Sequence, residues 1–209
     1  MTKPSVILIG AGGHARACID VVEQLDTFKI AGLVGIEEEL HHECLGYCII
    51  ATDSDLPKLA KQYQYALITV GQIESAFLRQ QIYEQVLNLG FKLPTIISPT
   101  AHVSRHAAVG GATIIMHGAI VNAGAKVGNN CIINTNALIE HDATVADHCH
   151  ISTGAIVNGT ANIGLGSFVG SGSVIKQGIT LGSNCLVGMG IAVRHHYAEN
   201  SRILTRKKL

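Results

Sequence analysis

Tryptophan is absent from this sequence, and aromatic residues of any kind make up only 4% of it. Charged residues are also scarce, at 14%, whereas hydrophobic residues reach 47%. A core of such composition must be filled by small and branched aliphatic side chains. The 23 glycines disfavour an ordinary helical bundle, because glycine destabilises helix interiors.

Net charge and long apolar runs are missing as well. Lys plus Arg and Asp plus Glu both number 15, so the chain has no overall field to attract nucleic acid or an anionic membrane. The first apolar run, Val6–Ile9, stops at Gly10, and no later run has the length of a membrane span or a signal segment. The six cysteines lack the tight pairing of a disulfide framework. We therefore expect a cytoplasmic protein with reduced thiols, no membrane insertion and no nucleic-acid partner.

A six-residue repeat dominates the second half of the chain. From His102 to Tyr197 the sequence divides into hexads without slippage, and the second residue of each is aliphatic: Val103, Val109, Ile115, Val121, Val127, Ile133, Ile139, Val145, Ile151, Val157, Ile163, Val169, Ile175, Leu181, Val187 and Val193. The sixth residue is small from Ala107 to Ser173. The sixth residue of one hexad and the second of the next are two apart, so both face inward on an extended strand. This pattern predicts a parallel β-helix whose coil of three short strands closes every 18 residues.

Two further features of the repeat support this interpretation. The sixth column also accommodates Cys131, Cys149 and Cys185 as small buried residues. Glycines recur at the third position, where we expect tight corners with positive φ: Gly110, Gly128, Gly164, Gly170, Gly182 and Gly188.

The first half predicts a small α/β domain with a parallel sheet, Rossmann-like in its opening turn. Strands are expected at residues 6–9, 30–34 and 65–70, and helices from residue 13 to about Leu25 and over 73–89. The turn Gly10-Ala-Gly-Gly-His-Ala15 offers backbone N–H groups and a helix N-terminus to a phosphate. Three interpretations remain open for it: a nucleotide diphosphate site, a nicotinamide site, or a purely structural turn. The nicotinamide reading lacks an acidic residue at the usual distance, since Glu37 and Glu38 lie beyond it.

The most informative segment is Ile139-Glu140-His141-Asp142. His141 holds the fourth, corner position of its hexad and is expected to point outward beside Asp142. An imidazole next to a carboxylate can act as a general base, since the carboxylate raises its basicity and fixes its orientation.

Residues 102–197 resemble the hexapeptide-repeat acyltransferases, whose fold is a left-handed β-helix that usually trimerises. Together with the Gly10–Ala15 turn and the Glu-His-Asp corner, nearly the whole chain resembles one branch of them. That branch contains the bacterial nucleotide-sugar 4-amino N-acetyltransferases and the sialic acid O-acetyltransferase-like proteins. The resemblance implies a nucleotide-sugar-binding α/β domain over residues 1–98 and a left-handed β-helix acyltransferase domain over 99–209.

The resemblance also implies the site. His141 and Asp142 are the expected catalytic pair, and transfer from acetyl-CoA to the sugar amine is expected to be direct, with no metal. The expected substrate-binding residues are Gly10, Gly12, Gly13, His14, Glu37, Gly71 and Asn134. The expected acetyl-CoA-binding residues are His150, Gly159, Ser171 and Met189, with active sites between the subunits of a homotrimer. Gly159 follows His141 by 18 residues, and Met189 follows Ser171 by 18, so each pair is expected to stack on one corner.

Some segments depart from the family pattern. Where the N-acetyltransferases tend to carry paired aspartates after the second strand, this chain has Glu37-Glu38-Glu39. A basic tail, Ser201–Leu209, replaces the usual C-terminal Gly-x-Pro-Ala-Lys segment, and it is either solvated or in contact with the CoA phosphates. The segment His41–Cys48 has the residue types of a zinc site but not the spacing of a standard finger, and is expected to be a loop. Two alternatives to sugar N-acetylation stay open: O-acetylation of sialic acid or a related sugar, and a non-enzymatic scaffold.

Overall fold

The computed structural model describes residues 2–204 and contains two compact units. Residues 1–71 and 78–99 form the first unit, and residues 72–77 and 100–209 form the second. Residues 205–209, which hold most of the basic tail, lie outside the described part of the chain. No helix within residues 2–204 is both long and apolar enough to cross a membrane.

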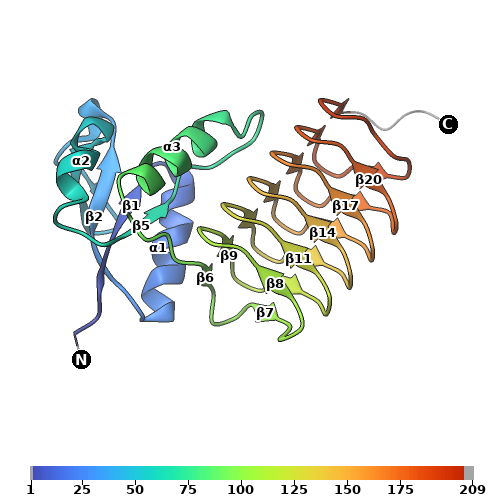
Figure 1. The fold of residues 1–209 in the computed structure, drawn as a ribbon, viewed down its shortest axis with the longest axis horizontal. Helices are drawn as coiled ribbons and strands as arrows, with labels where there is room; N and C mark the ends of the chain where they lie inside the picture. The colour runs from blue at the N-terminus through green and yellow to red at the C-terminus, as the bar shows by residue number, and fades with distance from the viewer. Residues whose placement is uncertain (1, 205–209) are drawn as a thin grey trace. The chain divides into compact units, whose positions relative to one another are not determined.

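The first unit is a three-layer α/β fold around one sheet (Figure 1). The strands are β1 (Ser5–Ile9), β2 (Lys29–Gly35), β3 (Glu43–Cys44), β4 (Tyr47–Thr52) and β5 (Tyr65–Ile68), in the order β3-β4-β2-β1-β5. The helices are α1 (Gly13–Leu25), α2 (Leu56–Leu59) and α3 (Phe77–Asn88), with 3-10 turns at Glu37–Glu39 and Asp53–Asp55 and a short strand β6 (Ile96–Ile97) after α3. Ile7 and Ile9 pack with residues of α2 and α3, whereas α1 buries its apolar side against the opposite face.

Three features of this unit differ from the sequence-based expectation. The sheet is mixed rather than parallel, because β3 pairs antiparallel with β4. The segment expected to be a loop after Glu39 is this hairpin, and Leu45 and Gly46 make its turn with φ values of 51° and 81°. Helix α3 begins at Phe77 rather than residue 73, where the hydroxyl of Ser75 accepts a hydrogen bond from the Phe77 N–H at 3.1 Å.

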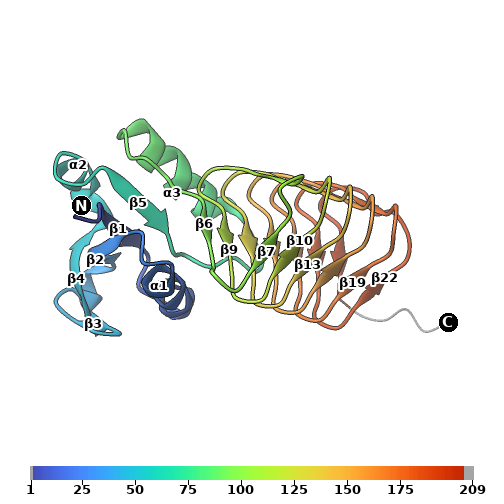
Figure 2. The ribbon, with the colours of Figure 1, turned by 90° about the horizontal axis from the view of Figure 1, so that it is seen from below.

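The second unit is the predicted left-handed parallel β-helix, with strands of two residues each (Figures 1 and 2). We name its three sheets C, D and E. Sheet C contains β9 (Ile114–Ile115), β12 (Ile132–Ile133), β15 (His150–Ile151), β18 (Phe168–Val169), β21 (Leu186–Val187) and β23 (Arg202–Ile203). Sheet D contains β7 (His102–Val103), β10 (Ile120–Val121), β13 (Leu138–Ile139), β16 (Ile156–Val157), β19 (Val174–Ile175) and β22 (Ala192–Val193). Sheet E contains β8 (Ala108–Val109), β11 (Lys126–Val127), β14 (Thr144–Val145), β17 (Asn162–Ile163) and β20 (Thr180–Leu181).

The register of the solenoid confirms the 18-residue coil. Ile120 pairs with Leu138, and Leu138 pairs with Ile156, in parallel ladders. The second and sixth columns form the interior, where Val121, Ala137 and Cys149 are fully buried. A large aliphatic side chain therefore packs beside a small one on every inner face.

Positive φ occurs at the fifth position of the hexads, not at the third as expected. Every fifth residue from position 112 to position 190 is left-handed: Ala112, Gly118, Gly124, Asn130, Asn136, Asp142, His148, Gly154, Thr160, Gly166, Gly172, Gly178, Asn184 and Gly190. This conformation turns each N–H toward a carbonyl of the preceding coil, as in Asn136 N–H to His117 O at 2.9 Å. The third-position glycines are needed for a different reason, because a Cβ on Gly164 would lie 2.4 Å from the Gly182 carbonyl carbon on the next coil.

Candidate active site

His141 and Asp142 occupy the corner between sheets D and E, directly after β13. Asp142 is the left-handed fifth residue of its hexad, with φ of 58°. The His141 Nδ1 lies 3.0 Å from the Asp142 Oδ2, and the two side chains are 54% and 64% exposed. A carboxylate at this distance favours the tautomer with hydrogen on Nδ1, which leaves the lone pair of Nε2 free to accept a proton.

Glu140 braces the same corner from the other side. Its Oε2 accepts hydrogen bonds from the His141 N–H at 3.1 Å and from the Asn122 amide at 3.0 Å. Asn122 precedes Glu140 by 18 residues and therefore lies one coil away in the same column. Sequence reasoning missed this contact, although the 18-residue spacing predicts it.

Gly159 provides the space that the imidazole occupies. A Cβ at position 159 would lie 2.6 Å from the His141 Nε2 and 2.7 Å from its Cε1. Since Gly159 has no positive φ, its lack of a side chain is required by the ring and not by the backbone. The structure therefore brings together three of the expected site residues, His141, Asp142 and Gly159.

Asn134, Ser171 and Met189 lie at a different corner, between sheets C and D. The Ser171 hydroxyl lies 2.9 Å from that of Ser152, and Met189 is 81% exposed. Within one chain, sheet D separates this corner from His141. The expected acetyl-CoA-binding residues are thus divided between two corners of the solenoid.

His150 is buried rather than presented to solvent, with 6% of its surface exposed. Its Nδ1 lies 2.6 Å from the Gln72 carbonyl oxygen, and its Nε2 lies 3.1 Å from the Asn134 side-chain nitrogen. Because a carbonyl only accepts and an amide nitrogen only donates, the ring is neutral with its hydrogen on Nδ1. The sequence did not point to Gln72, whose amide also donates to the Gly166 carbonyl at 3.3 Å.

The glycine-rich turn of the first unit joins β1 to α1. Gly10 has φ of 113°, and a Cβ there would lie 2.8 Å from the Val70 nitrogen. A Cβ at Gly12 or Gly13, in contrast, would meet no atom within 4 Å. Helix α1 starts at Gly13 with no acidic residue in its first turn, so its N–H groups and positive dipole end suit an anion.

Other expected substrate residues surround this turn. The His14 Nε2 lies 3.4 Å from the Cys18 Sγ, and a Cβ on Gly71 would lie 3.5 Å from the His14 Cβ. Burial raises the pKa of the Cys18 thiol to about 12, an effect that the Arg79 charge partly offsets. The thiol therefore stays protonated and can donate to His14 Nε2. Glu37 is exposed in its 3-10 turn.

Arg79 is a buried cation that the sequence analysis did not single out. It is 1% exposed, and its Nη1 donates to the carbonyls of Ile68 and Val70, both at 2.8 Å. These carbonyls end β5, so Arg79 fixes the backbone that leads to Gly71.

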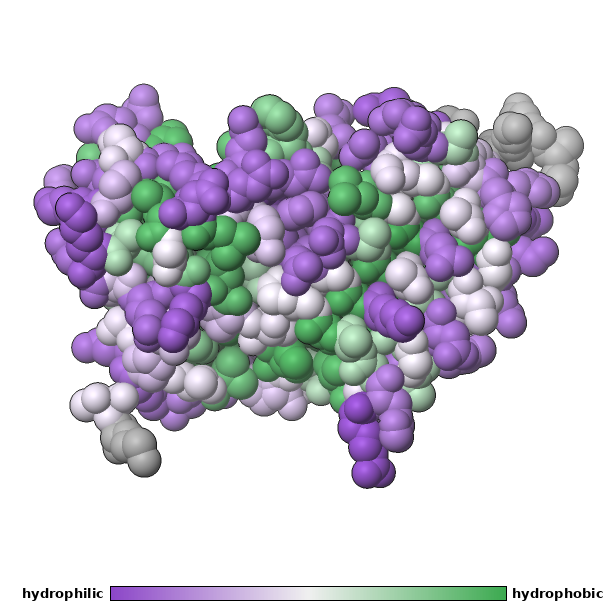
Figure 3. Space-filling view, viewed as in Figure 1, coloured by the Kyte–Doolittle hydropathy of each residue, from purple (hydrophilic) through white to green (hydrophobic). Residues whose placement is uncertain are grey.

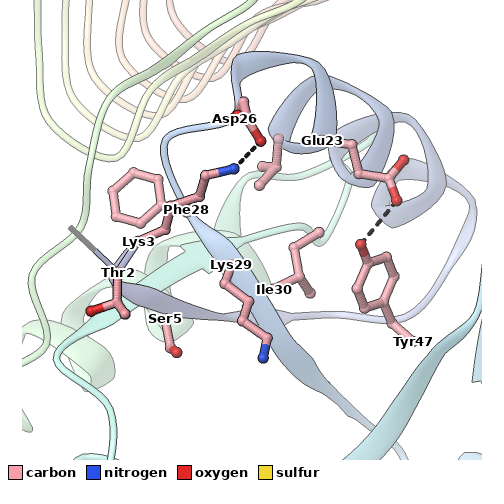
Figure 4. Close-up of a pocket in the computed structure, with 10 residues that line it drawn as sticks. Thr2, Lys3, Ser5, Glu23, Asp26, Phe28, Lys29, Ile30 and Tyr47 are labelled. Carbon is pink, nitrogen blue, oxygen red and sulfur yellow. Dashed lines mark hydrogen bonds and ion pairs between the residues drawn. The ribbon is translucent and has the colours of Figure 1, made fainter.

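A separate open pocket of about 750 Å³ lies at the start of β1 and β2, away from the Gly10 turn at their carboxyl ends (Figure 4). The Lys3–Asp26 ion pair and a hydrogen bond of 2.9 Å from Tyr47 to Glu23 cross its lining. It contains none of the residues expected to bind substrate.

Comparisons with known proteins agree with this geometry. The family model for the PglD N-terminal domain matches residues 5–86, and the model for the hexapeptide repeat of succinyl-transferase matches residues 161–194. No match was found among curated proteins. The acetyltransferase domain of PglB from Neisseria gonorrhoeae FA1090, solved with acetyl coenzyme A, is 30% identical, with 96% of each chain covered and a TM-score of 0.88.

A second relative extends the comparison. PerB from Caulobacter crescentus, solved with CoA and GDP-perosamine, is 27% identical, with 96% of this chain and 94% of that chain covered and a TM-score of 0.89. A variant of the Caulobacter perosamine N-acetyltransferase with a histidine replaced by asparagine has a TM-score of 0.90 at 27% identity, covering 96% and 93%. Fold and corner together define an acyltransferase built on a hexapeptide solenoid. The chain belongs to the hexapeptide-repeat acetyltransferases that carry a PglD-type N-terminal domain.

Proposed function

We propose that this acetyltransferase transfers the acetyl group of acetyl-CoA to the 4-amino group of a nucleotide-linked amino-deoxy sugar, with UDP or dTDP as the nucleotide. The observation that carries the proposal is the His141 corner, where Asp142 holds Nδ1 and Gly159 leaves Nε2 uncovered. The relatives support both substrates, because their structures contain acetyl coenzyme A in one case and CoA with GDP-perosamine in the other.

The chemistry needs one base and a positioned thioester. The amine nitrogen attacks the thioester carbonyl carbon while His141 Nε2 accepts a proton from it, and the carbon–sulfur bond breaks to release CoA as thiolate. A backbone N–H of the solenoid stabilises the negative oxygen of the intermediate. Asp142 keeps the imidazole oriented and stabilises its charged form after the proton transfer.

The N-terminal turn supplies the anion site for the nucleotide. Gly12 and Gly13 leave the N-terminus of α1 uncovered, which lets phosphate oxygens approach the backbone N–H groups. His14 and Gly71 border this turn, and Glu37 follows β2, so all three fit contacts with sugar or base.

Sheet D suits association with further copies of the chain. Its outward first column is an apolar ladder of Ile120, Leu138, Ile156, Val174 and Ala192, and Ile120 and Val174 are 38% and 37% exposed. The first column of sheet E is mostly polar, with Lys126, Thr144, Asn162 and Thr180. We infer a homotrimer in which sheet D faces a neighbour (Figure 2). Such packing brings the His141 corner of one copy beside the Ser171–Met189 corner of another, which unites the divided acetyl-CoA residues.

The test is a thiol-release assay with acetyl-CoA and UDP-, dTDP- or GDP-linked 4-amino-4,6-dideoxy sugars, with sialic acid as the competing acceptor. We expect release only with an amino sugar, and a loss of kcat of about 10²–10⁴ in His141→Ala with CoA binding kept. His106→Ala, another exposed solenoid histidine, is the control. Release with sialic acid alone would establish O-acetylation, and no release with any acceptor and no CoA binding would favour a scaffold.

A further inference from the structure

Two cations stack on the corner that carries His141. Lys176 and Arg194 take the third positions of hexads that begin with β19 and β22. Val174 pairs with Ala192 and Ile175 pairs with Val193, so the two cations continue the same parallel register. They lie two and three coils beyond Glu140, in the column that starts beside the catalytic base.

Their environment lacks a counter-charge. Both side chains are exposed, and neither forms an ion pair with a carboxylate within residues 2–204. Like charges in directly neighbouring register positions repel, which costs stability when no anion lies between them. The two residues line one open depression of about 420 Å³, together with Asn158, Val174, Gln177, Ala192 and Val193.

The spacing matches one part of the proposed donor. Stacked strands lie about 4.8 Å apart, so three coils separate the level of His141 from that of Arg194 by roughly 14 Å. The pantetheine arm of acetyl-CoA has about as many main-chain bonds as four residues of extended peptide, which span roughly 14 Å. A thioester held beside His141 Nε2 therefore places the pyrophosphate at the level of Lys176 and Arg194.

Resting on the proposed function, we propose that Lys176 and Arg194 form the site for the pyrophosphate of acetyl-CoA. Arg194 offers a planar fork of donors and Lys176 a point charge, a combination suited to two linked phosphates. The apolar Val174 and Ala192 border the path of the pantetheine arm, and the dianion removes the repulsion between the cations.

The experiment compares three donors: acetyl-CoA, its 3′-dephospho form and S-acetylpantetheine, which lacks the pyrophosphate. We expect Lys176→Met and Arg194→Gln each to raise the KM for the first two donors about ten-fold, the scale of a lost charge-assisted hydrogen bond. kcat and all constants for S-acetylpantetheine stay unchanged. Lys126→Met, on sheet E, is the matched control and leaves all three donors unaffected.

Calorimetric binding of CoA gives a readout that does not need an acceptor. The two variants are expected to weaken CoA binding and to reduce its salt dependence, with pantetheine binding unaffected. Equal KM values for variant and wild type with acetyl-CoA would overturn the pyrophosphate site while leaving the acetyltransferase intact. A defect limited to acetyl-CoA and absent with the dephospho form would also overturn it, in favour of the 3′-phosphate. Wild-type protein that neither binds CoA nor releases thiol would overturn the proposed function as well.

Discussion

At the scale of single residues, the candidate base depends on a glycine as much as on its carboxylate. The His141 imidazole occupies the space above Gly159, and Asp142 holds its other nitrogen at 3.0 Å. The pair His141–Asp142 was predictable from the sequence. The contact with Gly159 was expected only as one-coil stacking, because the rotamer that lays the ring over it is not encoded in the spacing.

Gly159→Ala is expected to displace the imidazole, since the new methyl group would lie 2.6 Å from Nε2. A shift of about 1 Å at a catalytic group can cost about 10²-fold in rate, so kcat falls while the melting temperature changes little. Steady-state kinetics and thermal denaturation measure the two effects. In the control Gly188→Ala the new Cβ has its nearest neighbour at 3.5 Å, and activity is expected to persist. An unchanged kcat in Gly159→Ala would contradict the placement of the base.

Cys18 makes the stability of the protein depend on alkaline pH. Its pKa is about 12 in the folded chain against an ordinary value of 9.0. Below pH 9 the thiol is protonated in both states. Above pH 9 it ionises in the unfolded chain only, so the free energy of unfolding falls by about 1.4 kcal/mol per pH unit until pH approaches the folded pKa.

Denaturant titrations of wild type and Cys18→Ala at pH 8 and pH 10 measure this effect. The loss of stability between the two pH values is expected to be smaller in the variant, because the other titrating groups are common to both proteins. Cys48→Ala, which removes an exposed thiol, is expected to behave as wild type. Identical losses in Cys18→Ala and wild type would show that the thiol does not have the raised pKa.

At the scale of secondary structure, the period of six was legible because each column has one fate. Second and sixth residues are interior, so a single apolar pattern runs through the solenoid. The role of glycine was assigned to the wrong column, because the third and fifth positions both favour small residues, one for close stacking and the other for left-handed φ.

The β3–β4 hairpin escaped prediction for a related reason. Its two-residue turn has positive φ at both positions, a geometry that Asn-Gly or Asp-Gly usually signals. Here Leu45 takes the first of these positions, with φ of 51°. An apolar residue in that place conceals the turn, and His41 and Cys48 drew attention to metal chemistry instead.

The fifth column also allows a stability prediction. Thr160 is β-branched and has φ of 58°, a conformation that costs such a residue about 1–2 kcal/mol. Thr160→Asn is expected to raise the free energy of unfolding by about 1 kcal/mol, because asparagine tolerates left-handed φ. Chemical denaturation measures the change. The reverse substitution, Asn184→Thr, is expected to destabilise by a similar amount, and a stabilising effect there would refute the argument.

At the scale of the whole molecule, the faces of the solenoid differ in polarity. In the view of Figure 3, hydrophobic residues are interspersed with hydrophilic ones over the solenoid. The outward column of sheet D is apolar throughout from Ile120 to Ala192, whereas that of sheet E is mostly polar. A face of this kind on a protein of zero net charge favours association between copies.

Ile120→Asp is therefore expected to dissociate the trimer, because it places a charge in the apolar ladder. Light scattering after size-exclusion chromatography measures the mass, and kcat/KM for acetyl-CoA is expected to fall with it. Thr180→Asp introduces the same charge on sheet E and is expected to leave mass and activity unchanged. A monomeric wild-type protein, or a trimeric Ile120→Asp, would refute sheet D as the contact face.

The three-sided coil also constrains how the length of this chain can change. Adding or deleting 18 residues inserts or removes one complete coil, and every later column keeps its face. An insertion of six residues would instead rotate all later hexads by one side, so that the apolar column of sheet D would continue on a neighbouring face and Lys176 and Arg194 would leave the corner of His141. Viable insertions and deletions in the solenoid are thus expected in whole coils, or as loops that leave a corner and return to it.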